Sequence, residues 1–133
     1  MQPRLSDDLK IVVNGWPKNA QTHFHGLRDI VKDTAATNPL VGPLTETLKW
    51  GEPSFLTEQS RSGTTLRVAW KSKSPDEIGL FVICRTDMLE QVRALFPDAF
   101  RYEGTRAAYL PLSQTIPVEA VSYLASRAQT YHL

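Results

Sequence analysis

The chain has 133 residues, which suits one domain built around one hydrophobic core. Apolar residues make up 41% of it and charged residues 22%, which indicates a globular protein and excludes a disordered one. The formal net charge of +1 predicts no general attraction to nucleic acid or to an anionic membrane.

The sequence carries no signal for export or membrane insertion. No apolar run approaches the roughly 20 residues that span a bilayer. Residues 1–8 are polar and mixed in charge, unlike the basic start and apolar centre of a signal peptide. The single cysteine, Cys84, excludes an internal disulfide. We therefore expect a cytoplasmic protein.

Two helices are expected in the first part of the chain. The first covers residues 6–13, with Ser6 as its cap, and Asn14-Gly15 ends it. The second begins with Pro17, a residue that suits the first position of a helix. Its apolar residues recur at helical spacing and predict one buried side, made of Ala20, Phe24, Leu27, Val31 and Ala35.

The middle of the chain predicts strands. Residues 45–50 and 53–57 fit two strands joined at Gly51-Glu52. Residues 64–71 alternate in polarity, with an apolar side made of Leu66, Val68 and Trp70. Residues 78–84 are apolar on both sides, as in a central strand. This strand ends at Cys84, which we expect to be a buried, unreactive thiol.

The last part of the chain predicts two helices and a strand. Asp87 and Glu90 have the spacing of a capping box, which begins a helix with the apolar side Met88, Val92 and Leu95. Residues 107–112 fit a further strand. Pro117 begins the last helix, whose expected buried side is Val121, Leu124, Ala128 and Tyr131.

Helices on either side of a run of strands indicate the fold class. The pattern predicts a single α+β domain over residues 1–133, with an antiparallel sheet from residues 45–112 that helices cover on one face. Its core is expected to include Phe24, Leu27, Val31, Leu66, Val68, Leu80, Val82, Leu95, Leu110, Val121 and Leu124.

One motif in the middle of the chain resembles a family signature. The run Lys49-Trp50-Gly51-Glu52-Pro53-Ser54-Phe55 is similar to the Lys-Trp-Gly-x-Pro-x-Phe signature of the YdhG-like family, a domain of unknown function. The resemblance continues through residues 66–71, 84–86 and 96–107. It covers the region from about residue 45 to residue 112.

The resemblance implies a compact α+β domain, described in some members as frataxin-like. One branch of the family is described as an intracellular iron chaperone, which implies iron as a cargo and iron–sulfur or haem assembly proteins as partners. Iron carriers need clustered oxygen donors. The chain has no long acidic run, and its 14 acidic residues are offset by 15 basic ones.

Three residues on the second expected helix could bind a metal. His25, Asp29 and Asp33 follow each other at intervals of four and would form one stripe of nitrogen and oxygen donors. An exposed helix face with ordinary ion pairs is the alternative interpretation.

A second candidate site combines aromatic and charged residues, as in a groove for a small anion or a partner peptide. The candidates are Lys49, Trp50, Glu52, Arg67, Lys71, Arg101, Tyr102, Glu103 and Arg106. We expect residues 50–53 and 101–104 to lie close together at one rim of the sheet. Their charges either brace these turns or line a pocket.

The sequence contains no recognisable catalytic set, so we expect a protein that is not an enzyme. Two functions remain open. One is a frataxin-like carrier that binds and delivers iron, and the other is a binding module that uses the groove with Trp50 and the arginines. The oligomeric state is not indicated by any pattern in the chain.

Overall fold

The computed structural model describes residues 4–83 and 87–133, which form four helices and six strands. The helices are α1 (Asp7–Asn14), α2 (Lys18–Ala36), α3 (Met88–Leu95) and α4 (Val118–Gln129). The strands are β1 (Thr45–Lys49), β2 (Glu52–Leu56), β3 (Leu66–Ala69), β4 (Glu77–Phe81), β5 (Arg101–Glu103) and β6 (Ala107–Pro111). This arrangement confirms the α+β class.

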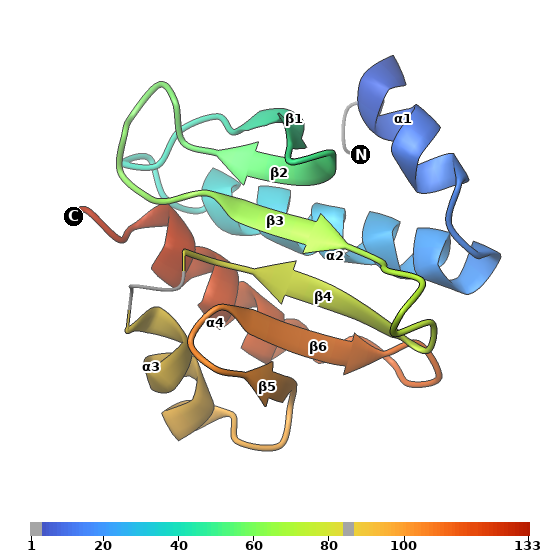
Figure 1. Ribbon diagram of the computed structural model, residues 1–133. Coiled ribbons are helices and arrows are strands. Elements are labelled where there is room, and N and C mark those ends of the chain that lie inside the picture. The colour runs from blue at the N-terminus through green and yellow to red at the C-terminus, as the bar shows by residue number, and fades with distance from the viewer. Residues whose placement is uncertain (1–3, 84–86) are drawn as a thin grey trace.

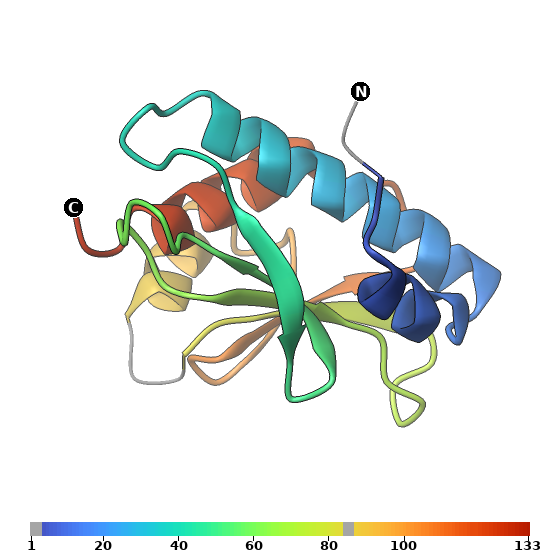
Figure 2. The ribbon, with the colours of Figure 1, turned by 90° about the horizontal axis from the view of Figure 1, so that it is seen from above.

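The strands form one antiparallel sheet in the order β1-β2-β3-β4-β6-β5. Helices α2 and α4 lie side by side on one face of this sheet (Figures 1 and 2). No helix of the described residues covers the opposite face, which we call the open face. The expected antiparallel sheet with helices on one face is therefore confirmed.

Strands β1 and β2 form a hairpin that bends away from the helices (Figure 2). Lys49 pairs with Glu52, so the loop between them has only two residues, Trp50 and Gly51. Both have positive φ angles, 56° and 75°. Such a loop is a type I′ turn, whose twist matches that of the two strands it joins.

The core lies between the sheet and the helices, where the apolar sides of the elements meet. Ten of the eleven expected core residues are buried, because periodicity correctly identified the inward side of α2, β3, β4, β6 and α4. Leu95 is the exception and is 61% exposed. The buried side of α3 is made of Met88, Leu89 and Val92, and the helix ends at Leu95.

Several details of the expected elements are wrong. Ser6 precedes α1 and Asp87 precedes α3, but neither residue makes the expected capping hydrogen bond through its side chain. Pro17 precedes α2 instead of being its first residue. Tyr131 lies beyond the end of α4 and is exposed. Strand β5 was not expected at all, and Cys84 lies outside the described residues.

Trp70 follows β3 and packs against the core while remaining partly exposed. Its indole N–H donates a hydrogen bond to the carbonyl of Pro75, at 3.0 Å. The expectation that Trp70 belongs to the core is therefore only partly met. Within residues 4–83 and 87–133, every helix is too short or too polar to cross a lipid bilayer.

Candidate functional site on the open face

The open face carries one continuous row of side chains from neighbouring strands. Ser54 of β2 pairs with Arg67 of β3, which pairs with Phe81 of β4. Phe81 pairs with Ala107 of β6, which pairs with Glu103 of β5. Directly paired residues project to the same side of a sheet. The row therefore places charged residues of β3 and β5 on the same face as an aromatic residue of the central strand β4.

Two aromatic rings occupy the middle of the open face. Phe81 and Tyr109 meet edge to face, with ring centroids 5.8 Å apart and an angle of 88° between the rings. They lie over Gly79, where an added Cβ would come within 2.7 Å of the Phe81 ring. Glycine is therefore required at this position for the two rings to lie over the strand.

Basic side chains cover these rings. The ammonium group of Lys71 lies 4.7 Å from the centre of the Phe81 ring, and the guanidinium of Arg67 lies 5.5 Å from it. The guanidinium of Arg101 lies 4.3 Å from the centre of the Tyr109 ring. These are cation–π contacts, and they leave both rings buried on a face without helices.

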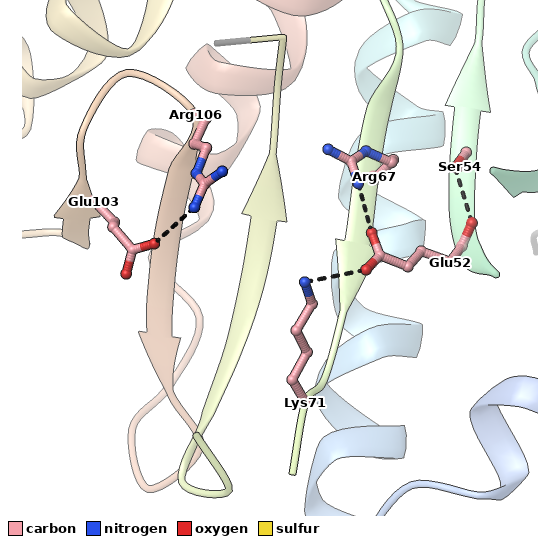
Figure 3. Close-up of polar contacts among 6 residues, drawn as sticks. All are labelled: Glu52, Ser54, Arg67, Lys71, Glu103 and Arg106. Atoms are coloured by element: carbon pink, nitrogen blue, oxygen red, sulfur yellow. Dashed lines mark hydrogen bonds and ion pairs between the residues drawn. The ribbon is translucent and has the colours of Figure 1, made fainter. Parts of the chain in front are cut away.

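Carboxylates hold the basic groups in place. Glu52 accepts a hydrogen bond from Nη1 of Arg67 at 2.8 Å and pairs with Nζ of Lys71 at 3.2 Å (Figure 3). Arg101 donates two hydrogen bonds to Glu77, both at 2.8 Å. These bonds raise the pKa of Arg101 above its ordinary value. The result is two clusters of fixed charge, one on each side of the aromatic pair.

A groove of about 550 Å³ lies beside the β1–β2 hairpin, on the side of Arg67. It is lined by Leu48, Lys49, Trp50, Thr65, Arg67 and Ile83. Trp50 is 90% exposed and Ile83 is 41% exposed, so the groove offers two apolar surfaces to solvent. Lys49 and Arg67 supply positive charge beside them.

The structure brings together only part of the predicted binding set. Glu52, Arg67 and Lys71 form one cluster, with Lys49 and Trp50 at the adjoining groove. The predicted residues Arg101, Glu103 and Arg106 lie on β5 and the β5–β6 turn, at the edge of the sheet opposite to β1 and β2.

Tyr102 does not belong to the open face. Its hydroxyl donates a hydrogen bond to the carbonyl of Phe96 at 2.7 Å, and its ring packs against Phe100. It pairs with Ala108, whose side chain is in the core. Burial raises the pKa of the Tyr102 hydroxyl, in agreement with a packing role.

The expectation that residues 50–53 and 101–104 lie close together is wrong. Strands β2 and β5 are separated by β3, β4 and β6, and the two turns lie at opposite edges of the sheet. The prediction rested on similar composition, which does not determine strand order. Each segment is instead balanced by its own neighbours. Glu103, for example, pairs with Arg106 at 3.6 Å in the same turn (Figure 3).

Four open-face residues on β4 and just after it were not predicted as site residues from the sequence: Glu77, Gly79, Phe81 and Ile83. Strand β4 and the two residues that follow it present these residues at every second position. This alternation was a usable signal, but the apolar residues between them made the strand look buried on both sides. Tyr109 on β6 was missed for the same reason.

The proposed metal stripe lies on α2. His25, Asp29 and Asp33 are all exposed. Among the residues that the structure describes, no group of three histidine, cysteine or acidic side chains is placed to hold a metal ion. The stripe is therefore not gathered into a metal centre in this conformation.

Comparisons of the chain with protein-family models, with curated proteins and with solved structures return no match. The resemblance to the YdhG-like family therefore stays a prediction, based on the motif at residues 49–55. The fold and the open face define the class of protein only as far as a small α+β chain with a charged, aromatic sheet face.

Proposed function

We propose that this protein is a non-enzymatic binding module, and that it binds a partner peptide or protein in the groove beside Trp50. The proposal rests above all on the conformation and exposure of Trp50. The groove, the cations beside it and the aromatic residues support the same interpretation.

Trp50 occupies a backbone position that disfavours it. The first loop residue of a type I′ turn needs a positive φ, and asparagine or glycine meets this need with least strain. A bulky residue in this region costs on the order of 1–3 kcal/mol. Trp50 has a φ of 56° and is 90% exposed, so packing in the isolated chain does not offset this cost.

A costly and exposed tryptophan is expected where the side chain contacts a partner. Tryptophan and arginine are among the residue types most often responsible for binding energy at protein interfaces. Here Trp50 and Arg67 line the same groove, with Ile83 as a second apolar surface. The combination supports a peptide-binding or protein-binding surface more strongly than a site for an ion alone.

The test is a panel of short synthetic peptides of varied charge and hydrophobicity, measured by calorimetry. We expect some members to bind the parent chain and to bind Trp50→Ala at least about tenfold more weakly, since central interface residues contribute about 2 kcal/mol or more. Leu40→Ala is the matched control, because Leu40 is 66% exposed elsewhere on the surface. Equal binding by the parent and Trp50→Ala would contradict the proposal.

Iron delivery is the second candidate, and it rests on the resemblance and on the exposed stripe His25, Asp29 and Asp33. In that case the chain carries iron to iron–sulfur or haem assembly proteins in the cytoplasm. The three donors lie on successive turns of one helix, and such an open, oxygen-rich site supports weak binding. The proposal of peptide binding in the groove does not depend on iron binding by this helix.

A further inference from the structure

Arg67 lines the groove and is held through one nitrogen of its guanidinium. Nη1 donates to Glu52 at 2.8 Å, and Figure 3 shows Nη2 pointing away from that carboxylate. Within the described part of the chain, the side chain of Arg67 makes no other hydrogen bond. Nε and Nη2 together form the second edge of the guanidinium, which matches the two oxygens of a carboxylate.

The neighbours of Arg67 fix its orientation. Glu52 also pairs with Lys71 at 3.2 Å, so its carboxylate is held from two sides. The guanidinium lies 5.5 Å from the centre of the buried Phe81 ring. An arginine that is already ordered loses little conformational freedom when it binds a second carboxylate.

The charge around the groove favours an acidic ligand. Around the groove, the basic residues Lys49, Arg67 and Lys71 outnumber the one acidic residue of their cluster, Glu52. The chain as a whole is almost neutral, so this excess is a local property of one face.

Resting on the proposed binding module, we propose that the groove recognises a peptide segment in which a carboxylate lies next to a bulky apolar side chain. The carboxylate binds the Nε and Nη2 edge of Arg67, with Lys49 nearby. The apolar side chain packs between Trp50 and Ile83, which line the same groove. Glu52 and Lys71 act as positioning residues, since they orient Arg67 without contacting the peptide.

The inference is tested with three hexapeptides that share one phenylalanine. The first carries a glutamate next to it, the second a glutamine, and the third a phosphoserine. On the parent chain we expect the glutamate peptide to bind about tenfold or more tightly than the glutamine peptide, as a charge-assisted hydrogen bond contributes on the order of 1.5–3 kcal/mol. Added salt should reduce this preference.

Two variants locate the effect. Arg67→Gln should abolish the preference for glutamate. Arg67→Lys should retain only part of it, because lysine keeps the positive charge but lacks the paired N–H donors that match the two oxygens of a carboxylate. Arg106→Gln is the matched control, since Arg106 is exposed on the same face but lies outside the groove. Thermal melts of each variant ensure that the comparison is made on folded protein.

The outcomes separate this inference from the proposed function. Equal binding of the glutamate and glutamine peptides, both weakened by Trp50→Ala, would overturn the carboxylate preference and leave the binding module standing. Tighter binding of the phosphoserine peptide would also overturn it, in favour of a phosphate ligand. Failure of all three peptides to bind, or binding that Trp50→Ala does not weaken, would contradict both proposals.

Discussion

At the scale of single residues, Glu46 ties the edge strand β1 to the long helix α2. Arg28, a buried residue of α2, donates a hydrogen bond from Nη2 to Glu46 at 3.0 Å, and Nζ of Lys32 lies 3.5 Å from the same carboxylate. Burial by itself raises the pKa of Glu46. The hydrogen bond and charge of Arg28, together with Lys32, outweigh burial and hold the pKa below its ordinary value.

The stability provided by Glu46 should therefore depend on pH. A lowered pKa means that the stabilisation is fully present above the pKa of the unfolded chain, about 4.3. It is lost as the pH falls through the still lower pKa of the folded state. We expect Glu46→Gln to reduce the free energy of unfolding by about 1.5–3 kcal/mol at neutral pH.

Urea denaturation of the parent and Glu46→Gln at pH 7 and pH 3 measures this effect. The difference in unfolding free energy between them should be smaller at pH 3, because this pH lies below the pKa of the unfolded chain and part of the stabilisation is lost there. Glu103→Gln is a suitable control, because Glu103 lies in an exposed pair at 3.6 Å and should contribute little at either pH. An equal loss for Glu46→Gln at both pH values would contradict the assignment.

At the scale of elements, the ends and faces of the helices decide which leucines stabilise the fold. Leu27 in the middle of α2 is fully buried, and Leu95 at the end of α3 is 61% exposed. We expect Leu27→Ala to lower the free energy of unfolding by about 2–5 kcal/mol, because it leaves a cavity in a packed core. Leu95→Ala should change it by no more than about 0.5 kcal/mol.

Chemical denaturation of these two variants checks the location of the core. They remove the same side chain from two helices, so any difference comes from the surroundings of the leucine. A small loss for Leu27→Ala would show that α2 does not bury Leu27 against the sheet. A large loss for Leu95→Ala would show that the end of α3 is packed into the core.

The same elements show how far the sequence could predict the fold. Helical spacing in residues 20–35 identified the buried side of α2, because a long amphipathic helix repeats its signal over several turns. The hairpin was predicted with Gly51-Glu52 as its loop, and the structure has the loop one residue earlier, at Trp50-Gly51, because Glu52 pairs with Lys49. Strand β5 was missed because three residues are too few to show a period. The order of strands depends on contacts distant in sequence, so the position of β6 between β4 and β5 could not be read from local patterns.

The candidate site was predicted in its residue types more than in its arrangement. Trp50, Arg67 and Lys71 were named because aromatic and basic residues stand close together in these parts of the chain. The partner of Arg101, which is Glu77, lies on β4 and was not named, since strand register decides that contact. Tyr102 was misplaced because alternation along β5 turns it toward the helices.

At the scale of the whole molecule, the sheet separates two kinds of packing. One face buries an apolar core against helices, and the other covers Phe81 and Tyr109 with basic groups and their carboxylate partners. Burial of the apolar core against the helices stabilises the fold. The open face keeps charged and aromatic groups at fixed positions, which is the property that a binding surface requires.

The iron hypothesis is tested on the whole chain by anaerobic titration with ferrous iron. If α2 carries the site, binding should be weak and should fall when Asp29 and Asp33 are both replaced by asparagine. Replacement of Asp7 and Asp8 by asparagine is the matched control, since both are exposed on α1. Binding that the Asp29 and Asp33 changes leave unaltered, or no binding by the parent, would reject this site.

The central claim is that Trp50 serves binding at a cost to the stability of the fold, and Trp50→Asn tests it most directly. Asparagine suits the first position of a type I′ turn. Urea denaturation and peptide calorimetry on this one variant should therefore show an unfolding free energy equal to that of the parent or up to about 1 kcal/mol higher, with peptide binding lost. A variant that is less stable than the parent by about 1 kcal/mol or more, or one that binds peptide as the parent does, would contradict the claim.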